Sequence, residues 1–337
     1  MIRDRVVSEQ ELREYLPGQT LSGELQALLL HQQATWELAR LGYKGLENVK
    51  TASFDLNFIR LSVQSNPGRM KSTTAKVDDS SIRARPCFLC HDNLPPEQRG
   101  ILYRDEFLLL VNPYPIFPEH FTIAHVDHRP QEVLAGFESL LSLALDLSPE
   151  YLVLYNGPRC GASAPDHLHF QAGTRTFLPL VEDYLNVCAR FGRLLADNGE
   201  VKVISVDRYL PAFIALESAS AKAMAEAFES IYRVVESVEG TNEEPMLNLL
   251  CWVDEGTWRL VIFLRSKHRP ERYFADPPRR ILMSPAAIDL GGVGVVPVED
   301  DFERVDGEVM KEIIEEVTLP AELFRDVTGA ISEVISE

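Results

Sequence analysis

The sequence lacks any apolar run of the roughly 18 to 20 residues that a membrane span requires. It also shows no secretory signal, because residues 1–5 lead into charged sequence without an apolar stretch. Neither a membrane protein nor a secreted one is indicated. The hydrophobic fraction of 45% and the charged fraction of 25% are typical of a globular protein with a substantial core. We therefore expect a cytoplasmic protein that does not contact a membrane.

Positive charge is scarce in this chain. Lys and Arg number 33 against 51 Asp and Glu, which gives a net charge of −18. Such a surface repels nucleic-acid backbones, so no nucleic-acid partner is expected. Residues 60–90 reverse this balance locally, with basic residues outnumbering acidic ones: Arg60, Arg69, Lys71, Lys76, Arg83 and Arg85 against Asp78 and Asp79. This basic stretch is either a site for a small anion or a solvated loop.

Cysteine is also sparse, with five residues in 337. An odd number without a secretory signal argues against a disulfide framework. Cys87-x-x-Cys90 is a spacing that suits zinc, whose tetrahedron then needs two further ligands. Redox use would require a helix start in a βαβ unit, which the flanking residues do not supply. A pair of buried free cysteines is the alternative. The candidates for the other two ligands are His91, His120, His125, His128 and His167.

The periodicity of apolar residues predicts a mixture of helices and antiparallel strands. Helices are expected at 22–41, 132–147, 181–196, 219–237 and from 308 onward, the last as a solvated acidic layer; strands are expected at 55–63, 102–111, 121–126, 151–155, 167–172, 247–253 and 258–264. Residues 122–130 and 262–270 resemble each other, because each is an apolar strand closed by His-Arg-Pro. This echo indicates either an old duplication or chance.

The run His167-Leu168-His169-Phe170-Gln171 carries the strongest chemical signal. Residues two apart in a strand share a face, so the three polar side chains point one way and the two apolar ones into the core. A histidine on such a rigid platform can attack phosphorus and later depart as a leaving group. By itself, however, a His-x-His pair also suits a metal or has no function.

A loop rich in small residues precedes this run. Residues 156–163 (NGPRCGAS) follow an expected strand, and Asn156, Gly161 and Ser163 are suited to holding a phosphate. Glycine lets backbone N–H groups approach an anion, and the Asn and Ser side chains add donors. The alternative is an ordinary tight turn.

These residues resemble the histidine-triad superfamily, in the branch with Gln in place of the last histidine. That branch includes galactose-1-phosphate uridylyltransferase, diadenosine tetraphosphate phosphorylase and GDP-galactose phosphorylase. The motif of the family is similar to residues 167–171, the strand that opens with a histidine to residues 120–128, and the phosphate loop to residues 156–163. Residues 85–90 (RPCFLC) also resemble an uncharacterised bacterial family. The specific likeness covers about 83–175.

The resemblance implies roles for individual residues. His169 becomes the nucleophile, and Gln171 a hydrogen-bond donor to a phosphate oxygen. Cys87, Cys90, His128 and His167 would hold a structural Zn²⁺. Other expected substrate contacts are Asn112 near the ribose, Asn156, Gly161 and Ser163 at the phosphates, and Arg69, Lys71 and Lys76 at the outer phosphates. Uridine and galactose specificity do not carry over, because Asp166 and Leu168 depart from the uridylyltransferase motif and Glu119 replaces its glycine.

The resulting prediction is an α+β protein with tandem histidine-triad-like halves around an antiparallel sheet and helical additions at both ends. The expected parts are a helical extension at 1–50, a catalytic half at 51–197, a degenerate half at 198–307 and an acidic helical tail at 308–337. The expected activity is that of a nucleotidyltransferase or phosphorylase. Its substrate would be a nucleoside diphosphate sugar or dinucleoside polyphosphate, and its acceptor phosphate or a sugar phosphate. The alternatives are a nucleotide hydrolase of the same fold and a non-catalytic nucleotide-binding module.

Overall fold

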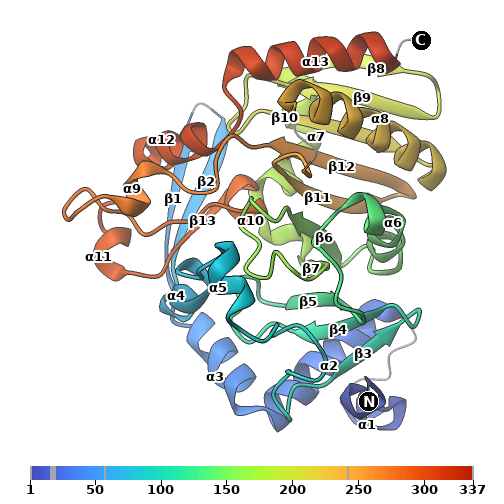
Figure 1. The fold of residues 1–337 in the computed structure, drawn as a ribbon, viewed down its shortest axis with the longest axis vertical. Coiled ribbons are helices and arrows are strands. Elements are labelled where there is room, and N and C mark those ends of the chain that lie inside the picture. The colour runs from blue at the N-terminus through green and yellow to red at the C-terminus, as the bar shows by residue number, and fades with distance from the viewer. Residues whose placement is uncertain (1, 16–19, 57, 241–242, 336–337) are drawn as a thin grey trace.

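The protein is built on one large antiparallel sheet, shown in Figure 1. The computed structural model describes residues 2–15, 20–56, 58–240 and 243–335. Ten strands lie in the order β3-β4-β5-β7-β6-β11-β12-β10-β9-β8. They are β3 (Gly100–Tyr103), β4 (Phe107–Val111), β5 (His120–His125), β6 (Tyr151–Asn156), β7 (His169–Thr174), β8 (Gly192–Asp197), β9 (Val201–Val206), β10 (Phe213–Ser218), β11 (Leu247–Asp254) and β12 (Thr257–Leu264).

The sheet consists of two halves with the same topology. In the first, β3, β4 and β5 are followed by helix α6 (Phe137–Asp146) and then by β6 and β7. In the second, β8, β9 and β10 are followed by helix α8 (Ala221–Glu239) and then by β11 and β12. The halves join where β6 pairs with β11. The predicted α+β fold with tandem halves is therefore confirmed, while the predicted residue boundaries of the domains stay a prediction.

The similarity between residues 122–130 and 262–270, which suggested a duplication, does not align equivalent strands of the two halves. It matches the end of β5 with the end of β12, whereas the order of the sheet relates β5 to β10 and β7 to β12. The second half is a structural repeat, but its His-Arg-Pro run is not the counterpart of the first one. β12 is apolar apart from Thr257 and Arg259 at its start, so it has no counterpart of the polar side chains of β7.

One face of the sheet is covered by helices. They are α2 (Leu21–Thr35), α3 (Glu37–Leu46), α6, α8 and α13 (Ala321–Ile335), and their apolar sides pack with the sheet into one core. The opposite face is covered over the central and second-half strands by α7 (Pro179–Phe191), α12 (Gly307–Val317) and a small sheet. The small sheet has the order β1 (Lys50–Leu56), β2 (Ile59–Ser65) and β13 (Val293–Val296). This second layer does not cover β4, β5 and β7, which leaves room for a cavity.

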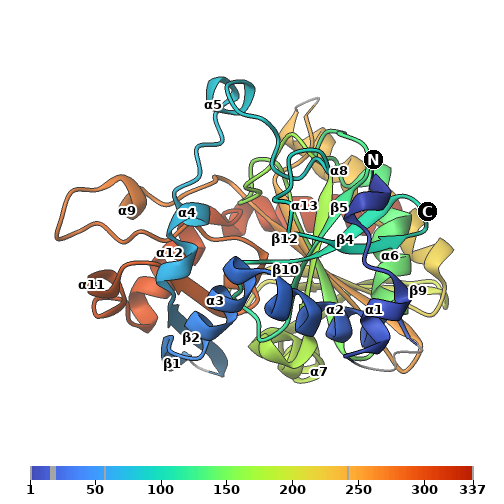
Figure 2. The ribbon, with the colours of Figure 1, turned by 90° about the horizontal axis from the view of Figure 1, so that it is seen from below.

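The remaining elements are short and lie mainly in the connecting segments. They are η1 (Ile2–Arg5), α1 (Glu9–Arg13), η2 (Pro67–Arg69), α4 (Met70–Thr73), α5 (Asp79–Arg83), η3 (Leu134–Gly136), η4 (Arg175–Phe177), α9 (Glu271–Phe274), α10 (Ala287–Leu290) and α11 (Glu299–Phe302). Figure 2 shows α5 projecting from the body of the molecule. Within the described part of the chain, no helix is both long and apolar enough to cross a membrane.

Several expected elements were too long because short turns interrupt them. The strand expected at 102–111 is the hairpin β3–β4, which turns at Arg104 and Asp105 with φ of 51° and 58°. The helix expected at 22–41 breaks at Trp36, whose backbone is extended. The helix expected at 181–196 ends at Phe191 and continues as β8. The acidic tail is helical as predicted but is not a simple solvated layer, because Met310 and Phe324 are buried.

Candidate active site

A cavity of about 700 Å³ lies over the uncovered part of the sheet. The register of the strands sets its floor. Leu110 of β4 pairs with Thr122 of β5, and Thr122 pairs with Gln171 of β7. Because cross-strand partners share a face, these three side chains form a row, with His169 beside it on β7. The roof comes from the chain between residues 69 and 98.

His169 is held with one ring nitrogen toward the protein. Its Nδ1 lies 2.8 Å from the backbone oxygen of His167, which can only accept, so Nδ1 carries the proton. The unprotonated Nε2 is then the nitrogen available to the cavity that His169 lines. The side chain is only 5% exposed, and burial lowers the pKa of His169 to about 4. A neutral imidazole with an oriented lone pair is the form that attacks phosphorus.

Gln171 is oriented by His120. The Nδ1 of His120 accepts a hydrogen bond from the backbone N–H of Ile116 at 3.1 Å, which places the proton of this ring on Nε2. That Nε2–H donates to Oε1 of Gln171 at 2.8 Å. Burial also lowers the pKa of His120 to about 3, so the ring stays neutral. The amide oxygen of Gln171 is thereby engaged, and its NH₂ group is left as the donor toward the cavity.

The loop at 156–163 is fixed against the second half of the chain. Oδ1 of Asn156 accepts hydrogen bonds from Nδ2 of Asn248 at 2.7 Å and from the backbone N–H of Ala287 at 2.9 Å. Gly161 has a φ of +98°, and a Cβ there would lie 2.7 Å from the Cβ of Ala286. The loop therefore needs glycine at this position both for its conformation and for its close approach to the second half.

A second, smaller cavity of about 60 Å³ lies beside the first. The two cavities share part of their walls, including Arg69, Ser163 and Gln171. The smaller one is polar and reaches residues of both halves. It is lined by Arg69, Ser72, Thr73, Ala75, Val77, Ile116, Asn156, Gly161, Ala162, Ser163, Gln171, His268, Arg269, Ser284, Ala286, Ile288, Asp289 and Val295.

All of the substrate-site residues predicted from the sequence line one of these cavities. The larger holds His169, Gln171, Asn112, Ser163, Arg69, Lys71 and Lys76, and the smaller holds Asn156 and Gly161. The individual roles stay predictions. Oδ1 of Asn112 accepts a hydrogen bond from the backbone N–H of Tyr114 at 2.9 Å, so this oxygen is already engaged by the protein. Of the basic stretch, Arg60 lies elsewhere and is paired with Glu182 and Asp183.

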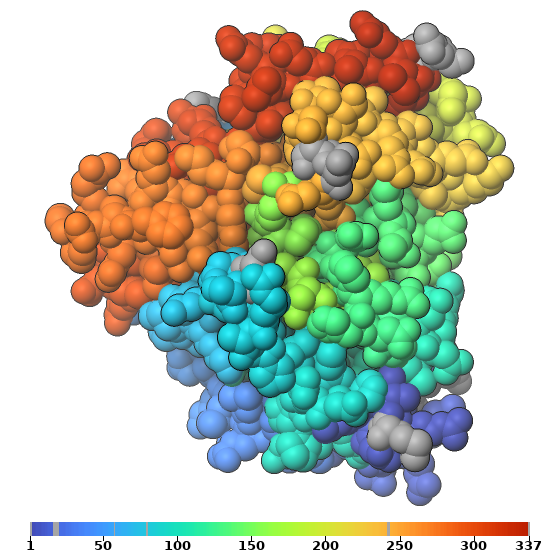
Figure 3. Space-filling view, in the orientation of Figure 1, coloured from blue at the N-terminus to red at the C-terminus, as the bar shows by residue number. Residues whose placement is uncertain are grey.

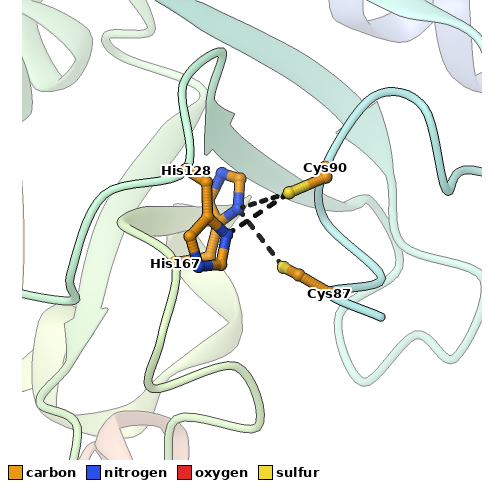
Figure 4. A group of neighbouring side chains, drawn as sticks. All are labelled: Cys87, Cys90, His128 and His167. Carbon is orange, nitrogen blue, oxygen red and sulfur yellow. Dashed lines mark hydrogen bonds between the residues drawn. The ribbon is translucent and has the colours of Figure 1, made fainter. Parts of the chain in front are cut away.

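The predicted metal ligands also meet, as Figure 4 shows. The ligand atoms of Cys87, Cys90, His128 and His167 all lie within 4.8 Å of one another. Cys87 Sγ is 3.3 Å from Nδ1 of His167, and Cys90 Sγ is 3.3 Å from Nδ1 of His128. The edges of a tetrahedron with zinc–sulfur and zinc–nitrogen bonds of ordinary length are about 3.3 to 3.8 Å. Two thiols and two imidazoles at these separations fit a metal ion.

The tautomer of His167 supports the same conclusion. Its Nε2 lies 2.7 Å from the backbone oxygen of His125, so Nε2 carries the proton and Nδ1 is free to bind a metal. The other histidines considered from the sequence serve elsewhere. His120 bonds to Gln171, His125 accepts the backbone N–H of Asp127, and Nδ1 of His91 lies 2.9 Å from Oδ1 of Asp92.

Sequence reasoning missed two side chains that hold the site together. Gln131 donates from Nε2 to the backbone oxygens of Asn156 and His169, and its Oε1 accepts the N–H of His169. Arg85 bonds to Asp166 and to the backbone oxygen of Ser163, while its buried Nη1 has no hydrogen-bond partner among the residues that the structure describes. Gln131 lies in no recognisable motif. The role of Arg85 could have been suspected from the sequence, because this residue belongs to the basic stretch and lies two positions before Cys87.

The sequence of the chain matches two families of proteins, one over each half. Two family models cover most of the chain: "Domain of unknown function (DUF4922)" matches residues 28–174, and "GDPGP1-like, C-terminal domain" matches residues 188–337. The first contains the four predicted metal ligands and the His169 motif, and the second contains the other half of the sheet. The chain is thus similar to the uridylyltransferase and phosphorylase branch of the histidine-triad superfamily, in sequence over each half and in fold over most of its length.

Similarity to individual proteins is limited to part of the sequence in one case and to the fold in the other. A galactose-1-phosphate uridylyltransferase of Bacillus subtilis (strain 168) is 30% identical over 123 residues, which is 32% of this chain and only 24% of that relative's length. Yeast Ap4A phosphorylase Apa2 is similar in fold, with a TM-score of 0.63, 16% identity and coverage of 88% of this chain and 97% of that one. The same enzyme in complex with Ap4A gives a TM-score of 0.61 at 16% identity, with coverage of 88% and 97%.

Proposed function

We propose that this protein transfers a nucleotidyl group through a covalent intermediate on His169. The observation that carries the proposal is the tautomer of His169, whose Nδ1–H is held by a backbone oxygen while Nε2 is left for the cavity. A fixed Gln171 amide and the loop at 156–163 stand beside it. These groups together form an aimed nucleophile next to donors for phosphate oxygens, as nucleotidyl transfer requires. The similarity to a protein named as a galactose-1-phosphate uridylyltransferase and to one named as an Ap4A phosphorylase supports an activity on nucleotides.

In the first step Nε2 of His169 attacks the α-phosphorus of the donor. The bond from this phosphorus to the leaving phosphate oxygen breaks, and the leaving group departs as a phosphate or phosphate ester. Positive charge develops on the imidazole, where the Nδ1–H hydrogen bond to the oxygen of His167 stabilises it. The NH₂ group of Gln171 donates to a non-bridging phosphoryl oxygen. In the second step an acceptor anion displaces the nucleotide from Nε2, which gives ping-pong kinetics.

The floor of the larger cavity also suggests how the nucleoside lies. Strands are about 4.8 Å apart, so Leu110 on β4 lies roughly 10 Å from the catalytic strand β7. With the phosphate at His169, the ribose falls near Thr122 and Asn112, and the base reaches the far end. That end is mainly apolar and is lined by Trp36, Leu94, Pro95, Leu110 and Gln98. We propose that it binds the base.

Gln98 is the polar side chain at this apolar end, and we expect it to contact the base. It is 8% exposed, and its Nε2 donates to the backbone oxygen of Val111, which leaves Oε1 to accept from a base edge. Gln98→Leu should weaken binding of a nucleoside monophosphate about 3- to 10-fold, as expected for loss of one hydrogen bond. Calorimetric titration measures this, with ribose 5-phosphate as the control ligand. An equal loss for ribose 5-phosphate would show that Gln98 acts on the fold and not on the base.

Hydrolysis is the competing reaction on the same fold. Neutral Gln171 occupies the position where a third histidine would act as an acid or base, which favours transfer to an anion over transfer to water. Nucleoside diphosphate sugars and dinucleoside polyphosphates should therefore turn over only when phosphate or a sugar phosphate is added. The test is product formation measured by chromatography with and without these acceptors. Equal rates in both conditions would rule out transfer and establish a hydrolase.

We propose that the four-residue cluster at Cys87, Cys90, His128 and His167 holds a structural Zn²⁺. Four protein ligands would complete a tetrahedron, so no position is left open for substrate. The contribution of these residues is to hold the chain between the cysteines. Phe88 and Leu89 of that chain line the nucleotide cavity. The metal would thus shape the site without taking part in the reaction.

A further inference from the structure

Strands β6 and β7 stop pairing with each other at the end that carries His169. Their ladder ends at the pair Leu154–Gln171. In the same register Asn156 would meet His169 two positions further on. Beyond the last pair, β6 stays with β11 of the second half as far as Asn156, and β7 stays with β5 of the first half as far as His169. The space between the backbones of Asn156 and His169 is here called the strand fork.

The side chain of Gln131 fills the strand fork with a single amide group. Its Nε2 donates to the backbone oxygen of Asn156 at 2.9 Å and to that of His169 at 3.0 Å. Its Oε1 accepts the backbone N–H of His169 at 2.8 Å. All three partners are backbone groups, each of which can only donate or only accept, so the orientation of the amide is unambiguous. The amide thus takes the place of the missing backbone pair and joins the two strands.

The strand fork is closed to water. Gln131 is 1% exposed, and Asn156 and His169 are each 5% exposed. Figure 3 shows the segment between β6 and β7 as a yellow-green surface between the cyan roof segment and the green part of the first half, whereas Gln131 is buried. Because buried backbone groups need partners and water does not reach these, the width of the fork depends on this one side chain.

The segment that carries Gln131 is itself anchored to both halves of the chain. The backbone N–H of Leu168, next to the proposed nucleophile, donates to the backbone oxygen of Arg129 at 2.7 Å. The backbone N–H of Val133 donates to Oε2 of Glu244, a residue of the second half, at 2.6 Å. The amide of Gln131 is therefore held on a fixed backbone and does not follow a shift of either strand.

The strand fork separates two groups that the proposed reaction brings to one phosphorus atom. One strand carries His169, and the other leads into the loop at 156–163. Gln131 holds both the N–H and the backbone oxygen of His169, so the direction in which the ring leaves the backbone depends on this amide. Reacting atoms must lie within about 3 to 3.5 Å of each other, and a misplacement of about 1 Å costs about 100-fold in rate.

We propose that Gln131 is a positioning residue for nucleotidyl transfer, which fixes the nucleophile and the loop at 156–163 at the separation that the transition state needs. The inference rests on the proposed function. Gln131 lines neither cavity, so it acts through His169 and Asn156 and not on the substrate itself. Formation of the adduct on His169 and its discharge both make or break a bond between phosphorus and Nε2. The two steps therefore depend on Gln131 alike, and binding of the nucleotide does not.

The experiment compares Gln131→Glu, which keeps the acceptor but replaces the NH₂ donor by an oxygen, with Gln131→Met, which removes both in a side chain of similar length. Rapid quench at a saturating concentration of labelled dinucleoside polyphosphate gives the rate constant and the amplitude of adduct formation. The rate constant should fall about 10- to 100-fold in both variants, with an amplitude close to that of the wild type. Discharge by inorganic phosphate or by glucose 1-phosphate should slow by a similar factor. The Kd of a nucleoside monophosphate, titrated calorimetrically, should change by less than about 3-fold.

Gln32→Glu is the matched control. Gln32 is also fully buried, its Oε1 accepts the backbone N–H of Arg99 at 3.1 Å, and its Nε2 donates to the backbone oxygen of Glu97 at 3.2 Å. It lines neither cavity. This variant should lose stability in the same way, while its rate constant of adduct formation at saturating donor stays at the wild-type value. Metal content is measured in every variant and should not change.

Rate constants within about 3-fold of the wild-type value in both Gln131 variants would overturn the proposal. A lower amplitude with a wild-type rate constant would also overturn it, because that result marks a partly folded sample. The same holds for an equal loss in Gln32→Glu or for loss of metal. A Kd that rises as much as the rate constant falls would assign Gln131 to binding instead.

Should the introduced carboxyl group prevent folding, Gln131→Met decides the question, since it is neutral. The failure of this inference is distinct from that of the proposed function. An adduct that forms in the wild type and equally fast in the Gln131 variants refutes the positioning role alone. Absence of any adduct in the wild type refutes the proposed function and removes the step that Gln131 would serve.

Discussion

Replacing His169 by alanine should reduce nucleotidyl transfer by about 10⁴-fold or more, which corresponds to about 5.4 kcal/mol or more of transition-state stabilisation. The reason is that no neighbouring group can take over the attack. His167 directs its Nδ1 to the two cysteines, and His120 directs its Nε2 to Gln171. Steady-state kcat/KM with a nucleoside diphosphate sugar or a dinucleoside polyphosphate measures the loss.

The control for this variant is His31→Gln, which changes a buried histidine of α2 that lines neither cavity. Its kcat/KM should stay close to that of the wild type. Thermal unfolding of His169→Ala should show that the fold is retained, because the ring contributes one hydrogen bond to the backbone of His167. A His169→Ala protein that keeps more than a tenth of the wild-type kcat/KM would exclude a covalent role for this residue.

Replacing Cys87 by serine should release the metal and destabilise the protein by at least about 3 kcal/mol, since loss of a structural metal is among the largest single-residue effects. Cys87 is 7% exposed and lies in a small cluster with Leu89, Ala124 and Ala164. Cys87 and His167 are the two buried members of the cluster, and without a metal Cys87 Sγ and Nδ1 of His167 are left facing each other at 3.3 Å. Metal content by atomic emission and the denaturant midpoint are the two measurements, with about one metal per chain expected in the wild type.

Cys188→Ser is the matched control for this change, because Cys188 lies in α7 outside the cluster. It should keep its metal. In Cys87→Ser the nucleotide should also bind more weakly, since Phe88 and Leu89 line the cavity. A wild-type protein that is fully stable without metal, or a Cys87→Ser protein with unchanged metal content, would remove the zinc assignment and leave Cys87 and Cys90 as two free cysteines.

The residues that we propose to carry the chemistry could be picked out from the sequence because they lie in short local patterns. Alternation in the strand put Leu168 and Phe170 into the core, and both are buried. The spacing of Cys87 and Cys90 identified half of the cluster, and the family resemblance selected His128 and His167 from several candidate histidines. The fold class followed for the same reason, since alternating strands and amphipathic helices are local features. The cluster is now seen as one group of four.

The parts that could not be predicted depend on contacts between distant segments. The bond from Asn248 to Asn156 spans 92 residues, and Arg269 meets Thr73 and Ala75 across almost 200. No local sequence pattern predicts a contact between residues so far apart in the chain. The hairpin turn at Arg104 and Asp105 was missed for a different reason, because neither residue is a glycine although both have positive φ. The apolar residues on the two sides of the turn therefore led to the prediction of one continuous strand at 102–111.

The central claim is that Nε2 of His169 becomes bonded to the nucleotide. Its most direct test is intact-protein mass spectrometry after incubation with a dinucleoside polyphosphate in the absence of phosphate, followed by peptide mapping under basic conditions. The account predicts an acid-labile, base-stable mass increase of one nucleotidyl group (a nucleoside monophosphate less one water) on the peptide that contains His169, lost in His169→Ala and discharged on addition of inorganic phosphate. An adduct on another residue, or turnover that never passes through an adduct, would contradict it.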